Sequence, residues 1–142
     1  MVRDPRIRLQ SGALPYRIEK NGKIRILLVT TGPGKRWGIP KGTAEPYLTL
    51  SQNAEKEAFE EAGVTGEISP HSAGMYRANK RNGVIDGFVE VWVYLLKVDK
   101  VLDDWPEKAR RRTKWVGPKE AAATLREPLL AKLCLDLKRA EP

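Results

Sequence analysis

The chain has 142 residues, a formal net charge of +8, and 41% hydrophobic and 31% charged residues. A chain of this length forms one compact domain with a buried core and is too short for two ordinary domains. The composition excludes the disordered class, and no apolar run approaches the ~20 residues that a membrane span needs. We therefore expect residues 1–142 to form a single globular domain with no membrane partner.

Cysteine content and charge limit the compartment and the partners. Cys134 is the only cysteine, and the N-terminal segment lacks the apolar stretch of a secretory signal. A single cysteine cannot form an internal disulfide, and a chain without a secretory signal is not expected to be exported. Both features therefore predict a cytoplasmic protein. The basic residues are scattered, without a zinc or RNA-recognition pattern, so a small polyanionic substrate explains the charge at least as well as nucleic acid does. We do not expect nucleic acid as a partner.

The predicted elements begin with a β-hairpin. Residues 9–20 and 23–31 are typical of strands, and Asn21-Gly22 between them predicts the positive-φ pair of a tight turn. Residues 32–47 are rich in glycine and proline and predict a loop.

A helix is predicted from about residue 50 to Ala62. Thr49 suits the N-cap, and Gln52 three residues later completes a capping box. Gly63 stands where a left-handed C-terminal cap is preferred. The helix therefore has a start and a stop signal of its own.

The second half of the chain predicts more strands. Residues 66–80 hold one or two strands, and Asn82-Gly83 predicts a second hairpin turn. Residues 87–98 alternate most clearly. One face of that strand carries Val89, Val91, Val93 and Leu95, and the other carries Phe88, Glu90, Trp92 and Tyr94.

The last elements are a short strand and two helices. Residues 113–116 predict the strand, Pro118 opens a helix, and residues 127–139 form an amphipathic helix with a leucine stripe. The order of strands and helices predicts an α/β fold, in which a mixed α+β sheet packs against helices as a sandwich.

Glutamates crowd one face of the helix at residues 50–62. Glu57, Glu60 and Glu61 fall within about 100° of arc at positions i, i+3 and i+4. An acidic solvated face is the ordinary explanation for such a group. However, the loop before this helix carries Lys35, Arg36 and Lys41. Carboxylates that bind Mg²⁺ or Mn²⁺ beside a basic loop are what phosphate chemistry requires.

These residues resemble the Nudix box. The family pattern is G, five residues, E, seven residues, then R-E-U-x-E-E-x-G-U, where U is aliphatic. Gly42 takes the first position, and the second part matches at Glu57, Ala58, Glu60, Glu61, Gly63 and Val64. The chain from about residue 10 to 137 also resembles the diphosphoinositol polyphosphate phosphohydrolase branch, through residues 37–42, 91–98, 101–107 and 114–121.

Two positions depart from the pattern. Leu48 stands where the box has its first glutamate, and Lys56 stands where it has arginine. In the family, that arginine usually orients a glutamate of the box, and lysine keeps its charge but loses the planar fork. Glu45, upstream in the same loop, is a weak candidate to replace the missing glutamate.

The resemblance implies a Nudix-type α/β/α sandwich and a hydrolase that uses Mg²⁺ or Mn²⁺ to cleave a phosphoanhydride bond. Glu57 and Glu61 are then the strongest candidates for metal ligands and Glu60 the next, with Lys56 among the catalytic residues. The resemblance also leads us to expect that Lys35, Arg36 and Lys41 bind substrate phosphate. The expected substrate is a nucleoside polyphosphate, a diadenosine polyphosphate or a diphosphoinositol polyphosphate.

The roles of several other residues stay open. Glu90 is a weak candidate for the general base, and we favour the interpretation that it is a strand residue that faces solvent. Trp37 either contacts substrate or anchors its loop, and Arg110-Arg111-Arg112 either reach phosphate or form a solvated turn. Cys134 is either core or exposed, and His71 is given no role.

Two rival functions remain. One is a catalytically weakened Nudix-fold module that binds a nucleotide or regulates a partner, which Leu48 and Lys56 favour and the intact glutamates oppose. The other is an enzyme that acts on the 5′ end of RNA, for which no extended stacking platform is evident.

Overall fold

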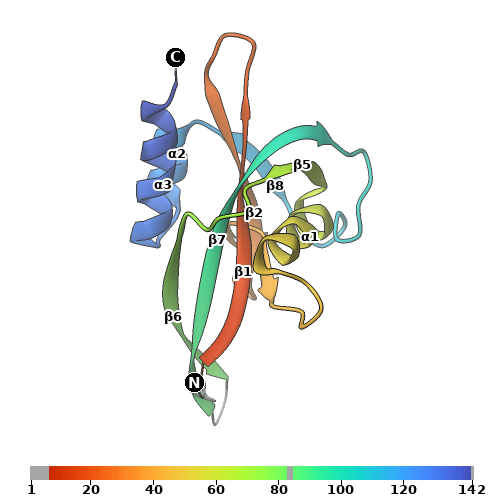
Figure 1. Ribbon diagram of the computed structural model, residues 1–142, viewed down its shortest axis with the longest axis vertical. Coiled ribbons are helices and arrows are strands. Elements are labelled where there is room, and N and C mark those ends of the chain that lie inside the picture. The colour runs from red at the N-terminus through yellow and green to blue at the C-terminus, as the bar shows by residue number, and fades with distance from the viewer. Residues whose placement is uncertain (1–6, 83–84, 142) are drawn as a thin grey trace.

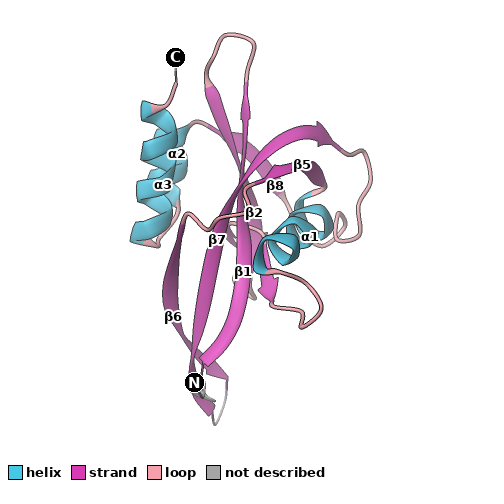
Figure 2. Cartoon of the chain, viewed as in Figure 1, coloured by secondary structure: helices cyan, strands magenta, loops and turns pink. Residues whose placement is uncertain are grey.

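The computed structural model describes residues 7–82 and 85–141. It contains a mixed sheet with α1 on one side and α2 and α3 on the other (Figure 1, Figure 2). The strands are β1 (Ile7–Ile18), β2 (Ile24–Thr31), β3 (Arg36–Gly38), β4 (Lys41–Thr43), β5 (Val64–Ile68), β6 (Gly74–Asn82), β7 (Ile85–Val101) and β8 (Thr113–Val116). The helices are α1 (Leu50–Ala62), α2 (Pro118–Thr124) and α3 (Pro128–Arg139).

The sheet is organised around two long strands, β1 and β7, which run parallel to each other. The main strand order is β3-β2-β1-β7-β5, while β4 pairs with β1, β6 with β7 and β8 with β2. Apart from the β1–β7 pair, the pairings are antiparallel. β1 changes partner along its length, because residues 10–12 pair with β4 and residues 16–18 pair with β2. The predicted mixed sheet is confirmed.

Both faces of the sheet are buried, which makes the fold a sandwich. Alternate residues of β7 divide between two cores, as the period of a strand requires. Val91 and Val93 face the leucines of α3, whereas Tyr94 and Leu96 face the alanines of α1. Cys134 is buried in the core under α3, so it is a core residue. The predicted division of the β7 faces is confirmed.

The caps of α1 form as predicted. The Thr49 hydroxyl accepts a hydrogen bond from the Gln52 backbone (3.1 Å), and the Gln52 side chain accepts one from the Thr49 backbone (2.9 Å). Gly63 ends the helix at φ 67°, where glycine is favoured. A Cβ at Gly63 would also lie 2.3 Å from the ring of Trp105, so this glycine is needed for close packing as well.

Two local predictions are wrong. Residues 32–47 are not one loop, because they contain β3 and β4, which are held by pairing with β2 and β1. The first hairpin is not a two-residue turn: the Glu19 backbone donates to Lys23, and Gly22 alone takes positive φ in the turn. This is the geometry of a type I turn followed by a left-handed residue. The second predicted turn, Asn82-Gly83, includes Gly83, which lies outside the described residues.

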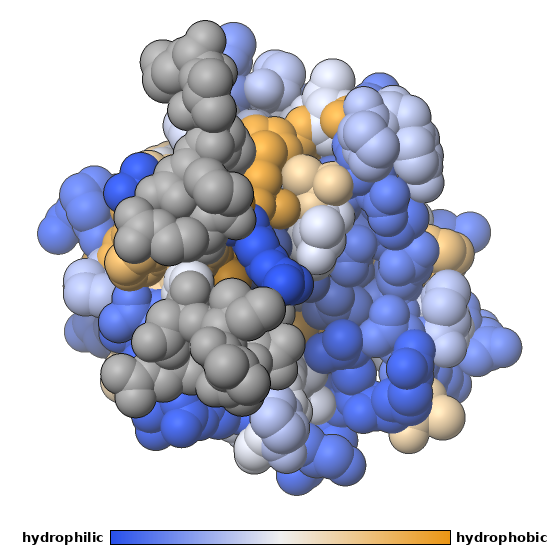
Figure 3. All heavy atoms as spheres, turned by 90° about the horizontal axis from the view of Figure 1, so that it is seen from below, coloured by the Kyte–Doolittle hydropathy of each residue, from blue (hydrophilic) through white to orange (hydrophobic). Residues whose placement is uncertain are grey.

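The surface agrees with the strongly charged composition. Seen from below, the described part of the molecule is mostly hydrophilic, and apolar side chains gather in a small central area (Figure 3). Within residues 7–82 and 85–141, no helix is long and apolar enough to cross a membrane.

Candidate active site

Two glutamates of α1 form a buried acidic pair. Glu57 and Glu61 are one helical turn apart and only 8% and 3% exposed. The Lys41 backbone donates to Glu61 Oε1 at 3.3 Å. Burial, the hydrogen bond that protonated Glu61 donates to Glu57 and nearby negative charges raise the pKa of Glu61 to about 8, against the opposing attraction of Arg111. The two carboxylates therefore compete for a proton that a metal cation can replace.

Gly42 on β4 makes room for Glu57. A Cβ at this glycine would lie 2.4 Å from Glu57 Oε1 and 2.5 Å from its Cδ. The glycine that matches the start of the Nudix box therefore acts through space on Glu57 of α1. The carboxylate rests directly against the backbone of β4.

Asn53 joins the start of α1 to the sheet and to the loop before the helix. It is fully buried, and its Nδ2 donates to Ser11 Oγ at 2.9 Å. Its Oδ1 accepts a hydrogen bond from the Glu45 backbone at 3.2 Å. The sequence analysis missed this residue. Its position one turn before Glu57, on the same helix face, was the available signal.

Lys56 occupies the place of the family arginine and binds several carboxylates. Its Nζ lies 3.2 Å from Glu60 Oε1, 3.5 Å from Glu57 Oε2 and 4.0 Å from Glu45 Oε1. Burial lowers the pKa of Lys56, but the hydrogen bonds and charges of Glu60 and Glu57 outweigh it and raise the pKa overall. Lys56 therefore stays charged and orients Glu60. Leu48 is half-buried and supplies no carboxylate.

The structure separates the predicted metal residues into two groups. Glu57 and Glu61 hydrogen-bond each other, while Glu60 is ion-paired with Lys56. Among the described residues, no three acidic, histidine or cysteine side chains already converge as a metal site. The buried pair, together with the oxygens of a substrate, is the donor set that suits a hard divalent cation.

The loop between β7 and β8 folds back onto the end of α1. Arg111 binds Glu107 Oε1 through Nε at 2.7 Å and lies 3.7 Å from Glu61 Oε2 through NH2. Its NH1 donates to the Thr30 carbonyl at 2.8 Å. Trp105 Nε1 donates to the Glu61 carbonyl at 3.2 Å, which fixes the loop in place.

The three consecutive arginines have different surroundings. Arg111 is ion-paired beside the acidic pair, Arg112 lies over the ring of Trp37 at 5.5 Å, and the Arg110 side chain is 75% exposed. The sequence analysis missed Glu107, which adds negative charge next to Glu61. The i, i+4 spacing of Glu107 and Arg111 was one available signal for it.

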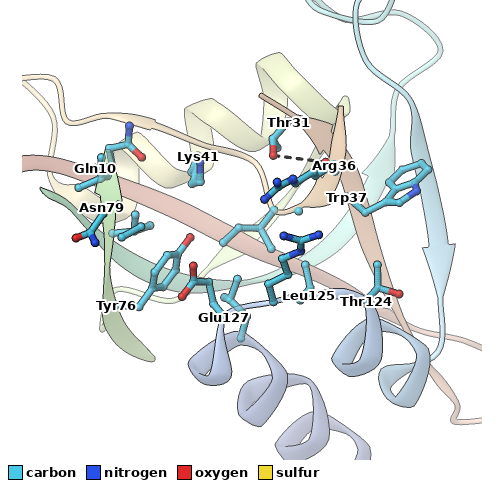
Figure 4. Close-up of a pocket in the computed structure, with 17 residues that line it drawn as sticks. Gln10, Thr31, Arg36, Trp37, Lys41, Tyr76, Asn79, Thr124, Leu125 and Glu127 are labelled. Carbon is cyan, nitrogen blue, oxygen red and sulfur yellow. Dashed lines mark hydrogen bonds between the residues drawn. The ribbon is translucent and has the colours of Figure 1, made fainter. Parts of the chain in front are cut away.

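The predicted phosphate-binding residues divide between two cavities. Arg36 and Lys41 line a cavity of about 490 Å³ on the α2–α3 side of the sheet (Figure 4). Lys35 lines a smaller one of about 180 Å³ with Glu107 and Arg111. Because the Lys41 backbone contacts Glu61, Lys41 connects the larger cavity with the acidic pair.

The side chains of Trp37 and Glu90 are both held by contacts with residues of neighbouring elements. Trp37 packs against the core and lies under Lys114 Nζ at 4.5 Å, so it anchors its strand as well as lining the larger cavity. The solvent-facing reading of Glu90 is wrong, because this residue is 6% exposed. It accepts a hydrogen bond from Trp92 Nε1 at 2.9 Å and pairs with Arg77 at 3.2 Å. Arg77 comes from the neighbouring strand β6, which the pattern of β7 alone does not reveal.

This geometry agrees with a comparison to known sequences. The sequence pattern of the NUDIX domain matches residues 9–135. The chain belongs to the NUDIX domain family.

Relatives of this family include named hydrolases. Nudix hydrolase 12, mitochondrial, of Arabidopsis thaliana is 31% identical over 134 residues, which cover 83% of this chain and 66% of the relative. Diphosphoinositol polyphosphate phosphohydrolase 3-beta of Bos taurus is 28% identical over 133 residues, covering 91% of this chain and 77% of the relative. The chain spans from 55% to 77% of the length of such curated relatives.

A solved structure shows the same fold. The Ap4A hydrolase of C. elegans superposes with a TM-score of 0.58 at 24% identity, covering 94% of this chain and 96% of that one. The family assignment is consistent with the predicted match of Gly42 and α1 to the Nudix box. The contact between Gly42 and Glu57 then gives the physical reason for that glycine.

Proposed function

We propose that this protein is a hydrolase that depends on Mg²⁺ or Mn²⁺ and cleaves a phosphoanhydride bond. The substrate is a nucleoside or dinucleoside polyphosphate, or a diphosphoinositol polyphosphate. The observation that carries the proposal is the buried Glu57–Glu61 pair beside the Lys41 backbone. Two buried carboxylates in contact are unfavourable without a cation or a proton between them.

Glu57 and Glu61 are the proposed metal ligands, and Glu60 is a third candidate that Lys56 orients. A bound divalent cation would neutralise the diphosphate and lower the pKa of the attacking water. That water would form a bond to one phosphorus and release a proton to the solvent, and the bridging oxygen would leave with the electrons of the broken P–O bond. The fixed backbone of β4 and the Lys56 contacts hold the carboxylates in place during this reaction.

Arg36, Lys41 and Lys35 are the proposed phosphate-binding residues. Arg36 and Lys41 lie along the larger cavity, and Lys35 lies beside Glu107 and Arg111. Positive side chains in both cavities suit a chain of several phosphates, because each phosphate gains charge-assisted contacts. The relatives named for diphosphoinositol polyphosphate and Ap4A support this substrate class.

A substrate panel tests the proposal. Purified protein with Mg²⁺ is given diadenosine polyphosphates, nucleoside triphosphates, dinucleotide cofactors and a diphosphoinositol polyphosphate, and the products are separated by chromatography. We expect hydrolysis of at least one polyphosphate, abolished by EDTA and strongly reduced in Glu57→Gln. Absence of hydrolysis across the panel with Mg²⁺ and with Mn²⁺ would contradict an enzyme.

That negative result would favour the second candidate, a binding module with weakened catalysis. Leu48 supplies no carboxylate at the first glutamate position, and Lys56 lacks the bidentate fork of arginine. Nucleotide binding measured by calorimetry without turnover would identify it. The cytoplasmic location stays a prediction, since several relatives are named mitochondrial.

A further inference from the structure

The carboxylate of Glu61 has a positively charged partner within the chain. Arg111 NH2 lies 3.7 Å from Glu61 Oε2, and the Glu61 side chain is only 4% exposed. Solvent screens a buried ion pair much less than an exposed one, so the charge of Arg111 acts strongly on this carboxylate. Lys56 lies beside the other member of the acidic pair, 3.5 Å from Glu57 Oε2. Each carboxylate of the pair therefore has a cation of its own.

Arg111 makes three polar contacts of different length. Its Nε donates to Glu107 Oε1 at 2.7 Å, and its NH1 donates to the Thr30 carbonyl at 2.8 Å. Both are strong hydrogen bonds, whereas the 3.7 Å between NH2 and Glu61 is too long for one. The contact with Glu61 is therefore mainly electrostatic. It can be given up while the other two contacts hold the guanidinium in place.

The backbone beside Arg111 is fixed by hydrogen bonds that do not involve the Arg111 side chain. The Arg112 backbone N–H donates to Thr30 Oγ1 at 3.0 Å, and the Arg112 carbonyl accepts from the Thr30 backbone at 3.0 Å. The Glu107 backbone N–H donates to the Glu60 carbonyl at 2.9 Å. Replacing the Arg111 side chain should therefore leave this segment in place and remove the charge.

Lys56 does not serve the acidic pair in the same way. Its Nζ lies 3.2 Å from Glu60 Oε1, nearer than it lies to Glu57, so its main partner is outside the pair. Its side chain is 33% exposed, against 23% for Arg111. Solvent therefore screens the charge of Lys56 more strongly. A competition between a side chain of this protein and a metal should be strongest at Glu61.

We propose that Arg111 is a positioning residue that serves as the counter-ion of Glu61 until a divalent cation binds, and that it competes with the cation for this carboxylate. The proposal rests on the function proposed above, because it requires Glu61 to be a metal ligand. A divalent cation carries twice the charge of a guanidinium and binds carboxylate oxygens directly, so it displaces the long contact. Arg111 thus holds Glu61 in position for the metal and weakens metal binding.

Mg²⁺ binding to charge variants tests the competition. Dissociation constants are measured by calorimetry without substrate at pH 9, above the pKa of about 8 for Glu61, so that proton release contributes little. Arg111→Met should bind Mg²⁺ about tenfold more tightly than wild type, because the metal no longer displaces a cation. Mg²⁺ affinity that is unchanged or weaker in Arg111→Met would overturn the proposal.

The neighbouring arginine provides a matched control. Arg110→Met removes the same charge one residue away, from a side chain that is 75% exposed and pairs with Glu107 instead of Glu61. Its Mg²⁺ affinity should stay within about twofold of wild type, since exposed charges contribute little. Arg111→Lys keeps the charge and should stay within about threefold. An equal gain in Arg110→Met and Arg111→Met would show a general effect of net charge and refute the competition.

Thermal unfolding at the same pH separates a counter-ion from a structural role. In EDTA, Arg111→Met should melt several degrees below wild type, because the buried carboxylate loses its cation. In saturating Mg²⁺ the difference should shrink, because the metal replaces the lost charge. Equal decreases in both conditions would show that Arg111 matters only through Glu107 and Thr30. If Arg111→Met does not fold, Arg111→Gln removes the charge, keeps an N–H donor and should give the same results.

The outcomes separate this proposal from the function on which it rests. Mg²⁺ binding by wild type with no gain in Arg111→Met refutes the role of Arg111 and leaves the hydrolase intact. A gain in Mg²⁺ affinity without hydrolysis of any polyphosphate supports the role of Arg111 and contradicts the enzyme. A wild-type protein that binds neither Mg²⁺ nor Mn²⁺ contradicts both.

Discussion

Replacing Gly42 with alanine should disable the site through a single methyl group. The new Cβ would lie 2.4 Å from Glu57 Oε1, 2.5 Å from its Cδ and 2.7 Å from Oε2. Ordinary non-bonded contacts begin near ~3.4 Å, so the carboxylate must move by about 1 Å. Glu57 is 8% exposed, which leaves little room for that movement.

The expected loss follows from this displacement. A misplacement of about 1 Å in a catalytic group can lower the rate by roughly 10²-fold. Overpacking costs about 1–3 kcal/mol of unfolding free energy, and the melting temperature should fall by several degrees. Initial rates at saturating Mg²⁺ and calorimetric unfolding measure the two effects separately.

Gly34→Ala is the matched control for this substitution. Its Cβ would have Arg36 Cγ at 4.0 Å as the nearest neighbour, so the methyl group meets open space. We expect wild-type rates and an almost unchanged melting temperature. A Gly42→Ala protein with wild-type turnover and metal affinity would show that the Gly42–Glu57 contact has no part in catalysis.

The other predictions concern charge. Because the pKa of Glu61 is raised to about 8, Mg²⁺ must displace a proton below that pH, and calorimetry should show metal affinity falling by about tenfold per pH unit. In EDTA the native state holds the Glu61 proton more tightly than the unfolded state does. The melting temperature should therefore fall as pH rises from about 4.5 to 8 and level off above pH 8. A melting temperature that does not change with pH would contradict the raised pKa of Glu61. Lys56→Met should lower turnover by about tenfold, since Glu60 loses its ion pair, and Lys56→Arg should retain activity; equal rates for both would refute an orienting role. Alanine at both Lys35 and Arg36 should raise KM more for substrates with longer phosphate chains, and added salt should do the same; equal changes for short and long chains would argue against phosphate binding by this loop.

The sequence predicted α1 and its caps because their causes are local. Thr49, Gln52 and Gly63 act within a few residues of themselves, and the structure places them as expected. The alternation of β7 was equally readable, because the period of a strand divides its residues between two cores. The family resemblance depended on the spacing of residues in the same helix, so it too could be recognised from local sequence.

Features that depend on distant contacts were missed. β3 and β4 have three residues each and form only because β2 and β1 lie beside them. Three residues are too few for any periodicity. Glu107 joins the site because Trp105 ties its loop to the end of α1, a contact between residues 44 positions apart.

Neighbours in sequence also separated in space. Lys35 and Arg36 were grouped as one basic loop, but they line different cavities. Lys35 has φ 50°, in the left-handed region, and the chain turns there before β3 begins. The buried state of Glu90 likewise depends on Arg77 of β6, which no pattern within β7 reveals.

The rate of the Glu61→Gln variant tests the central claim most directly. The change keeps the size of the side chain and removes one anionic oxygen from the buried pair with Glu57. Hydrolysis of a diadenosine polyphosphate at saturating Mg²⁺ is compared between wild type, Glu61→Gln and Glu90→Gln. We predict a loss of at least about two orders of magnitude for Glu61→Gln and a milder loss for Glu90→Gln. Full activity in Glu61→Gln would contradict a metal-binding role for the acidic pair.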